Sequence, residues 1–449
     1  MPSFPAVGVL ALLLIACPAP ASDPFTDPRA GDALRAELDS YPDGPVTAVH
    51  RLWTAYLESK ADGFDCGPSD YWLASEQGTW TTPDGREYTL CYDLAGAMLG
   101  ARREYAVLRI DPVPGTGGTE YSITTLFPAG DIAGHDALVT VFAVREGDDW
   151  KLAGALGRLT RTWRQETVGR FTYIIRPGHV FSRERAQAAV AFADSLADAF
   201  GVPRIRPLRY YVVADADAML HVMGYRPDTT YGGAGGRSLP GIIISGDPAF
   251  GEKHGHEIAH HVIQPLQGPR LHIVASEGVP TWLGGTRGMH YPDALLTLRA
   301  WLEEHPAATL DSVLADNGHP MHNPAAALLS AMVYEQGGVD AIRRFLDSGP
   351  TWPAFRAGVE EIFGASWKSV ADEWRRRAMR VDSTVEDRQI GSPGSDLVPV
   401  LPGHHSRDLR EVTEVVCHPG REQLPERDRA EGGVLAFERE LALADLPSP

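Results

Sequence analysis

The chain has 449 residues, enough for two or three domains at about 100–200 residues each. Its composition, 43% hydrophobic and 22% charged, excludes a wholly disordered chain, a collagen-like fibre and a small disulfide scaffold. The formal net charge of −18, from 41 basic and 59 acidic residues, repels phosphate backbones, so no nucleic-acid partner is expected.

The first residues predict an export signal. The apolar run at 6–16 is shorter than the roughly 20 residues of a membrane-spanning helix and has the length of a signal-peptide core. An A-x-A-like cleavage site would release a soluble protein at Ser22, so that residues 1–21 form the signal peptide. A lipobox-like stretch would instead make Cys17 the lipidated first residue. We therefore expect a periplasmic or extracellular protein, soluble or anchored as a bacterial lipoprotein, with no mature transmembrane span.

The next part of the chain predicts a linker and then a small α+β domain. Residues 22–45 are rich in Pro, Asp and Gly, which favours a linker. Within the expected domain at 46–165, apolar residues follow helical spacing over 46–59 and strand-like runs come after it. Those strands are expected at 87–93, 104–110, 120–127, 137–145 and 150–156. A helix followed by an antiparallel meander resembles the NTF2-like domains, which implies a structural or recognition role.

The four cysteines leave two interpretations open. In an exported protein, Cys66 and Cys91 of the first domain form a disulfide or remain two buried thiols. Cys417 has no evident partner. Because the chain contains no CxxC pair, the sequence does not support a thiolate zinc site.

Residues 170–380 predict a second domain in which a mixed α/β part gives way to helices. A Gly-rich loop at 231–236 precedes an apolar strand at 241–245 and lacks the form of a phosphate-binding loop. The other strands are expected at 171–175 and 208–213, and the helices at 182–200, 252–263, 291–304, 309–316, 324–336, 338–347, 353–363 and 367–379. Residues 381–449, poor in apolar side chains, predict a disordered tail.

The chemistry-bearing motif is an HExxH sequence at 256–260, for which composition alone predicts about 0.03 chance occurrences. On a helix, His256 and His260 lie one turn apart on one face, so both imidazoles can bind one metal ion. Glu257 stands next to the first ligand and can act as general base on a metal-bound water. A third ligand should come from another element, and Glu277 is the best candidate, in a second helix beyond a short strand at 271–274.

The HExxH motif and the Glu-Gly-x-x-x-Trp sequence at 277–282 resemble those of the gluzincins, zinc metallopeptidases of the peptidase MA-like group. The resemblance implies a zincin-like fold and one Zn²⁺ per chain, held by His256, His260 and Glu277. It also implies that Glu257 takes the proton of the attacking water and passes it to the leaving amine.

The same resemblance implies how a peptide or protein substrate is held. An edge strand near 242–245 would pair with the extended main chain of the substrate. Many gluzincins have alanine at the position of Pro280. Because proline is acceptable in a first helical turn, the second helix is expected to start just before Pro280.

Gluzincins usually add a Tyr or His that steadies the oxyanion, and His322 lies where the family often has this tyrosine. The rival candidates are Tyr334, Tyr291, His319 and His290. Other conspicuous side chains have simpler expected roles. His254 and His261 would form their own hydrogen bonds off the ligand face, Trp282 would pack in the core, and His404 and His405 would be solvated.

These observations predict an exported zinc metallopeptidase as the leading function. The alternative is a binding lipoprotein with a peptidase-like, zinc-containing domain that no longer turns over. A third interpretation is an interaction protein without metal, in which the HExxH arose by chance. The sequence sets neither the substrate nor the choice between exo- and endopeptidase action.

Overall fold

The computed structural model describes residues 30–59, 70–76, 79–81, 87–89, 105–127, 137–226, 235–239, 241–268, 270–316 and 318–381. The predictions on the export signal, all four cysteines, His404, His405 and the tail after 381 fall outside these residues. The described chain is a mixed α+β protein, as predicted. None of its described helices is both long enough and apolar enough to cross a bilayer.

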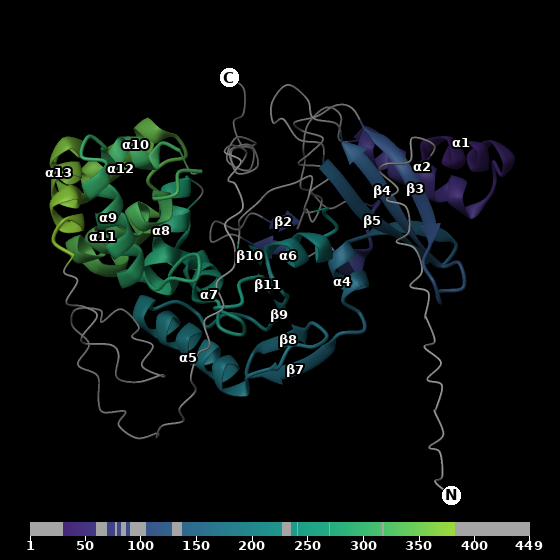
Figure 1. Ribbon diagram of the computed structural model, residues 1–449, viewed down its shortest axis with the longest axis horizontal. Helices are drawn as coiled ribbons and strands as arrows, with labels where there is room; N and C mark the ends of the chain where they lie inside the picture. The colour runs from purple at the N-terminus through teal and green to yellow at the C-terminus, as the bar shows by residue number, and fades with distance from the viewer. Residues whose placement is uncertain are drawn as a thin grey trace, which may run out of the picture.

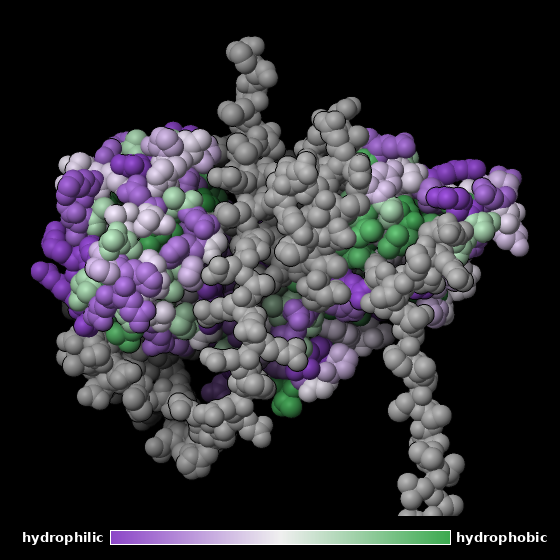
Figure 2. Space-filling model, turned by 45° about the horizontal axis from the view of Figure 1, so that its top comes forward, coloured by the Kyte–Doolittle hydropathy of each residue, from purple (hydrophilic) through white to green (hydrophobic). Residues whose placement is uncertain are grey.

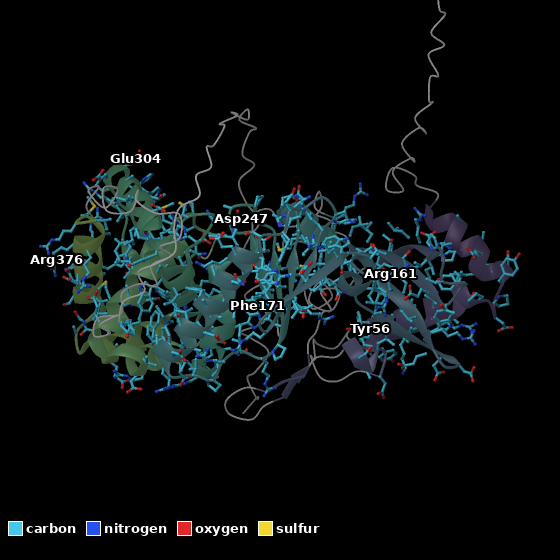
Figure 3. All side chains as sticks on the ribbon, turned by 90° about the horizontal axis from the view of Figure 1, so that it is seen from below. Tyr56, Arg161, Phe171, Asp247, Glu304 and Arg376 are labelled. Atoms are coloured by element: carbon cyan, nitrogen blue, oxygen red, sulfur yellow. The ribbon has the colours of Figure 1, made fainter. Side chains whose placement is uncertain are left out.

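Three parts follow one another across the molecule (Figure 1). Two helices and a four-stranded sheet form one end, a five-stranded sheet forms the middle, and a group of helices forms the other end. Figure 3 marks these parts by Tyr56 at the first end, Phe171 in the middle and Arg376 at the last. The helical end is covered mostly by hydrophilic residues (Figure 2).

The first region is an antiparallel meander with a helix packed against it. Helix α2 (Pro45–Ser59) lies against the sheet, and Trp53, fully buried, donates a 2.8 Å hydrogen bond from its Nε1 to Thr125 Oγ1. The sheet has the order β3-β4-β5-β6. Its strands are β3 (Ala106–Pro112), β4 (Glu120–Phe127), β5 (Ala137–Glu146) and β6 (Asp149–Ala153). The last four of the five predicted strands therefore form an antiparallel meander, as expected.

Three elements of the first region differ from the sequence prediction. Residues expected in the linker at 22–45 form helix α1 (Ala30–Ser40), because Leu34 and Leu38, one turn apart, pack on the core of the sheet. Of the strand expected at 87–93, the described residues form β2 (Glu87–Thr89), and residues 90–93 lie outside the described residues; the partner of β2 is β1 (Thr79–Thr81), which was not predicted. The strand expected at 150–156 ends at Ala153, where Gly154 begins helix α4 (Ala155–Leu159).

The five-stranded sheet has the order β10-β11-β9-β8-β7. Its middle strands are parallel and its two outer strands are antiparallel to their neighbours. In chain order the strands are β7 (Arg164–Val168), β8 (Phe171–Ile175), β9 (Leu208–Val212), β10 (Gly236–Leu239) and β11 (Ile242–Ser245). The sheet thus begins before residue 170.

The edge strand next to the HExxH helix is β10, which corrects the expectation that 242–245 forms the edge. The turn after Leu239 reverses the chain at Gly241, whose φ of +71° suits glycine, and β10 then covers β11. The last glycine of the Gly-rich stretch, Gly236, belongs to this strand. A strand of Gly, Arg, Ser and Leu carries little β-propensity, so the sequence pattern did not predict it.

Helices dominate the rest of the described chain, close to the predicted ranges. Helix α5 (Arg183–Phe200) is capped by Ser182, which accepts the N–H of Arg185, and ends at Gly201 in the left-handed conformation. Helix α11 (His322–Phe345) is interrupted at Gly337 and Gly338, where the prediction separated two helices. The others are α6 (Ala216–Val222), α7 (Gly255–Ile263), α8 (Ile273–Gly284), α9 (Tyr291–Glu304), α10 (Leu310–Leu314), α12 (Trp352–Phe363) and α13 (Trp367–Ala378).

The two regions are joined by shared packing. The segment after α6 pairs with the start of β5: Thr140 N–H donates to the Gly224 carbonyl at 2.7 Å, and Arg226 N–H to the Leu138 carbonyl at 3.3 Å. Leu220 and Tyr225 are buried in the core of the first region. The first sheet is therefore completed by residues of the second region.

Candidate metal centre

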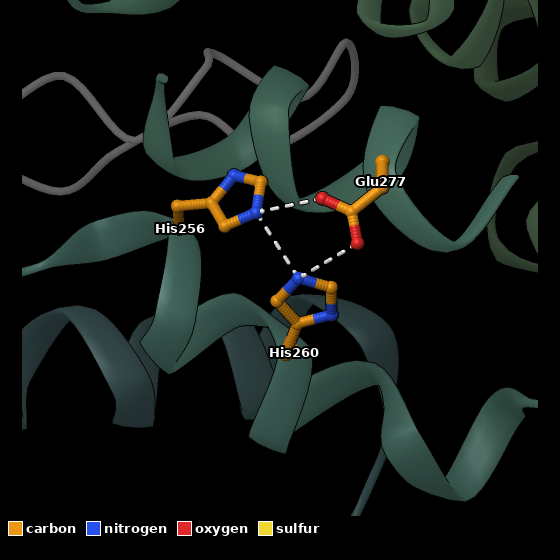
Figure 4. A group of neighbouring side chains, drawn as sticks. All are labelled: His256, His260 and Glu277. Carbon is orange, nitrogen blue, oxygen red and sulfur yellow. Dashed lines mark hydrogen bonds and ion pairs between the residues drawn. The ribbon is translucent and has the colours of Figure 1, made fainter. Parts of the chain in front are cut away.

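Helices α7 and α8 bring the three predicted ligands together (Figure 4). His256 Nε2 lies 3.2 Å from Glu277 Oε2 and 3.1 Å from His260 Nε2, and His260 Nε2 lies 3.6 Å from Glu277 Oε1. One ligand atom from each residue falls within 4.8 Å of the others. Glu277 keeps 22% of its side chain exposed and His260 15%, so the cluster is open to solvent on one side.

Glycines at the helix crossings set this geometry. A Cβ on Gly284, the last residue of α8, would overlap the backbone of Gly255, the first residue of α7. A Cβ on Gly278 would lie 2.7 Å from the Ala326 carbonyl oxygen of α11. Because only glycine permits both approaches, α8 fits between α7 and α11 and carries Glu277 to the two histidines.

Helix α8 begins earlier than predicted, which corrects two expectations. Residues 271–274 do not form a strand: His272 caps the helix, with its Nδ1 accepting the Val274 N–H at 3.2 Å. The apolar, β-branched pattern favoured a strand, whereas this cap and the burial of Val274 favour the helix. Pro280 lies inside α8 instead of in its first turn, so the Ser276 carbonyl lacks the usual partner four residues on.

The orientation of His256 is fixed from behind. Its Nδ1 donates to the Gly285 carbonyl at 3.0 Å, and Thr281 Oγ1 lies 3.4 Å from the same nitrogen. Since a carbonyl only accepts, Nδ1 carries a hydrogen and Nε2 is the nitrogen that faces the cluster. Such outer hydrogen bonds orient metal-binding histidines in proteins.

The charges of the cluster are strongly coupled. Burial opposes ionisation of Glu277, yet the two histidines lower the pKa of its carboxyl to about 2. Burial likewise opposes protonation of His256, but its hydrogen bond to Glu277 and the neighbouring carboxylates raise its pKa to about 9. Burial lowers the pKa of His260 to about 3. Without a metal the site thus holds an imidazolium–carboxylate pair, and a divalent cation would replace its proton.

Glu257 has the properties of a proton-transfer group. It is 6% exposed, and burial raises the pKa of its carboxyl to about 7. It faces the edge strand, since a Cβ on Gly236 would lie 2.6 Å from Glu257 Oε1. A carboxyl with a pKa near neutrality can both accept and return a proton at pH 7.

His322 is the predicted oxyanion donor that lies near the cluster. Its charge acts on Glu277, it is 1% exposed, and its Nδ1 donates to the Asp316 carbonyl at 3.2 Å. Its Nε2 is buried with no hydrogen-bond partner among the described residues.

The four rival donors have other surroundings. Tyr334 packs against Trp282 and Phe200, and His319 meets the ring of Trp301 edge-on. Tyr291 is half-buried near Glu335 and Arg377, which act on its pKa, and His290 precedes α9 with an exposed side chain.

The flanking residues follow their predicted roles. His261 Nε2 donates to the Ile242 carbonyl at 3.1 Å, and Trp282 is a buried core residue. His254 Nδ1 lies 3.3 Å from Ser245 Oγ. The sequence analysis missed Gly285 and Thr281 behind His256. For Gly285 the sequence did offer a signal, because the Gly-Gly pair at 284–285 marks the end of the apolar helix α8.

Comparison with known proteins adds no assignment to this geometry. No protein-family model matches the chain, and no curated protein matches it.

Proposed function

We propose that this protein is an exported zinc metallopeptidase of gluzincin type, which hydrolyses peptide bonds with Glu257 as general base. One observation carries the proposal: the ligand atoms of His256, His260 and Glu277 lie within 4.8 Å of one another, beside the buried carboxyl of Glu257. The five-stranded sheet with its antiparallel edge supports a zincin-like fold. The first region, a helix on a meander, supports the NTF2-like assignment.

The donor set fits the proposed metal. Two imidazole nitrogens and one carboxylate are a common ligand set for catalytic zinc, and they leave a fourth position for water. Other divalent metals accept the same donors. When bound, zinc lowers the pKa of its water and polarises the carbonyl of the substrate.

The chain's own residues do the remaining chemistry. Glu257 accepts the proton of the attacking water and returns it to the leaving amine, for which its raised pKa suits it. His256 is held in place by the Gly285 carbonyl. His322 is the proposed donor to the oxyanion in its protonated form, which carries a hydrogen on both ring nitrogens, because its buried Nε2 has no partner among the described residues.

The substrate would lie along β10. This strand forms an edge of the sheet, and an extended peptide can add to such an edge by main-chain hydrogen bonds. Gly236 of β10 lies directly beside Glu257, so a peptide paired with the strand passes close to the base. The proposed substrates are accordingly extended segments of peptides or proteins.

A zinc-containing binding protein without turnover is the second candidate. It is favoured by the protonation of His322: with its hydrogen on Nδ1, bonded to Asp316, a neutral imidazole has none on Nε2 for an oxyanion. The interior Pro280 also distinguishes α8 from the usual gluzincin helix.

The decisive experiment measures metal and hydrolysis together, on the chain without residues 1–21. Elemental mass spectrometry should find about one zinc per wild-type chain and a strong loss in His260→Ala and Glu277→Ala. Glu257→Gln should keep the zinc and lose cleavage of a peptide library by at least about 10²-fold. No zinc after reconstitution, or full cleavage by Glu257→Gln, would refute the peptidase. Zinc binding with no cleavage in the wild type favours the binding protein.

A further inference from the structure

A second histidine lies next to the proposed general base. His254 is 4% exposed, and its Nε2 lies 4.0 Å from Glu257 Oε1. It is not one of the three clustered ligands. The His254 backbone N–H donates to Tyr210 Oη at 2.8 Å, and the Phe250 ring stacks on the imidazole with centroids 4.6 Å apart. The Tyr210 contact fixes the backbone, the Phe250 ring orients the imidazole, and Nε2 is presented to Glu257.

The surroundings of His254 determine which nitrogen carries the hydrogen. Ser245 Oγ lies 3.3 Å from Nδ1, and a hydroxyl can donate to that nitrogen. An ionised Glu257 only accepts hydrogen bonds, which favours the hydrogen on Nε2. With this arrangement, Ser245 Oγ donates to His254 Nδ1, and His254 Nε2 is the donor that faces the Glu257 carboxylate.

The edge strand covers this pair at a glycine. A Cβ on Gly236 would overlap the His254 ring and would lie 2.6 Å from Glu257 Oε1. With glycine there, β10 closes over both side chains and keeps them away from water. A neutral donor in such a setting acts more strongly on a carboxylate than it would in solvent.

We propose that His254 is a positioning residue for Glu257, whose Nε2–H holds one carboxylate oxygen and leaves the other to accept the proton of the water. The inference rests on the proposed function, in which Glu257 is the base. The proposal requires a side-chain rotation of Glu257 that closes the 4.0 Å separation to hydrogen-bond length when substrate and metal fill the site.

The kinetic test compares His254→Ala, His254→Gln and the control His261→Gln on the peptide that the library shows to be cleaved best. His254→Ala should lower kcat about 10–100-fold, with KM and zinc content unchanged. His254→Gln should recover most of this loss, because its amide nitrogen can take the place of the imidazole Nε2. His261, bonded to the Ile242 carbonyl, should tolerate Gln with kcat near wild type. An unchanged kcat in His254→Ala, or equal losses in the Ala and Gln variants, would overturn the proposal.

A crystallographic experiment tests this inference separately from the proposed function. In crystals of the zinc-loaded wild type, His254 Nε2 should lie within about 3.2 Å of a Glu257 carboxylate oxygen. A separation of 4 Å or more in that state would refute the positioning role, whatever the activity. If the protein binds zinc and shows the contact but cleaves no peptide, the peptidase proposal is refuted, whereas the contact between His254 and Glu257 is confirmed.

Discussion

The two regions of this molecule treat buried polar groups in opposite ways. Up to β6, the described buried polar side chains are Thr47 and Thr125, each with a neutral hydrogen bond. The second region buries ionisable side chains around α7 and α8, namely Glu252, His254, His256, Glu257, His272 and His322. Burying such groups opposes folding unless they are paired or used. The contrast agrees with the proposed function, in which the second region carries the chemistry.

The largest expected effect concerns the glycine that brings the ligand helices together. Gly284→Ala should destabilise the second region by about 3 kcal/mol, because the new Cβ overlaps the Gly255 backbone and α7 and α8 must separate. Zinc content should fall with it. Gly157→Ala is the control, since a Cβ there meets no atom within 4 Å. Melting curves and zinc content check both variants, and a stable, zinc-loaded Gly284→Ala would contradict the geometry.

The next effect tests whether the buried polar groups serve chemistry. His322→Gln should lower kcat by about 10²-fold while zinc is retained, because its free Nε2 is the proposed oxyanion donor. His319→Gln, beside Trp301, should leave kcat near wild type. Steady-state kinetics on the best library peptide decide this. A change in KM alone would assign His322 to substrate binding instead.

A third variant tests the joint between the regions. Gly224 has φ of +92° and a Cβ there would overlap the Thr140 carbonyl oxygen, so Gly224→Ala should cost about 2 kcal/mol. Because the two regions share packing, calorimetry should show one transition moving as a whole. Gly147→Ala, with φ of +64° in open space, controls for backbone strain alone. Two transitions, of which one alone moves, would show that the regions unfold independently.

The smallest expected effect is a change in how the melting temperature depends on pH. Burial lowers the pKa of His272 to about 4, so the folded state keeps this ring neutral. Its contribution is fully present above pH 6.5 and is lost as the pH falls toward 4, because the unfolded chain takes up the proton first. In chelator-treated protein, His272→Asn keeps a capping side chain and should flatten the fall in Tm between pH 6.5 and 4.5. His305→Asn, on an exposed side chain, should leave the slope unchanged; equal slopes in all three proteins would reject this account.

The sequence predicted best what depends on local spacing. The i, i+4 histidines needed only a helix, and the second motif located Glu277. The pairing of β10 was missed because its residues form a strand only when β11 lies beside them. The start of α8 was missed because Leu271 to Val274 fits a strand until the core and the His272 cap select the helix. Contacts such as His254 with Glu257 depend on how the edge strand closes, which no residue spacing encodes.

The joint at Gly224 also orders events during synthesis. Residues 142–146 of β5 pair with β6, whereas Leu138 and Thr140 bond to the segment that ends at Arg226. Until that segment emerges, this side of β5 offers unpaired backbone groups and an incomplete core that lacks Leu220 and Tyr225. The first region therefore cannot finish folding when its own last strand is made. If the chain is exported, this delay favours its passage as an unfolded polypeptide.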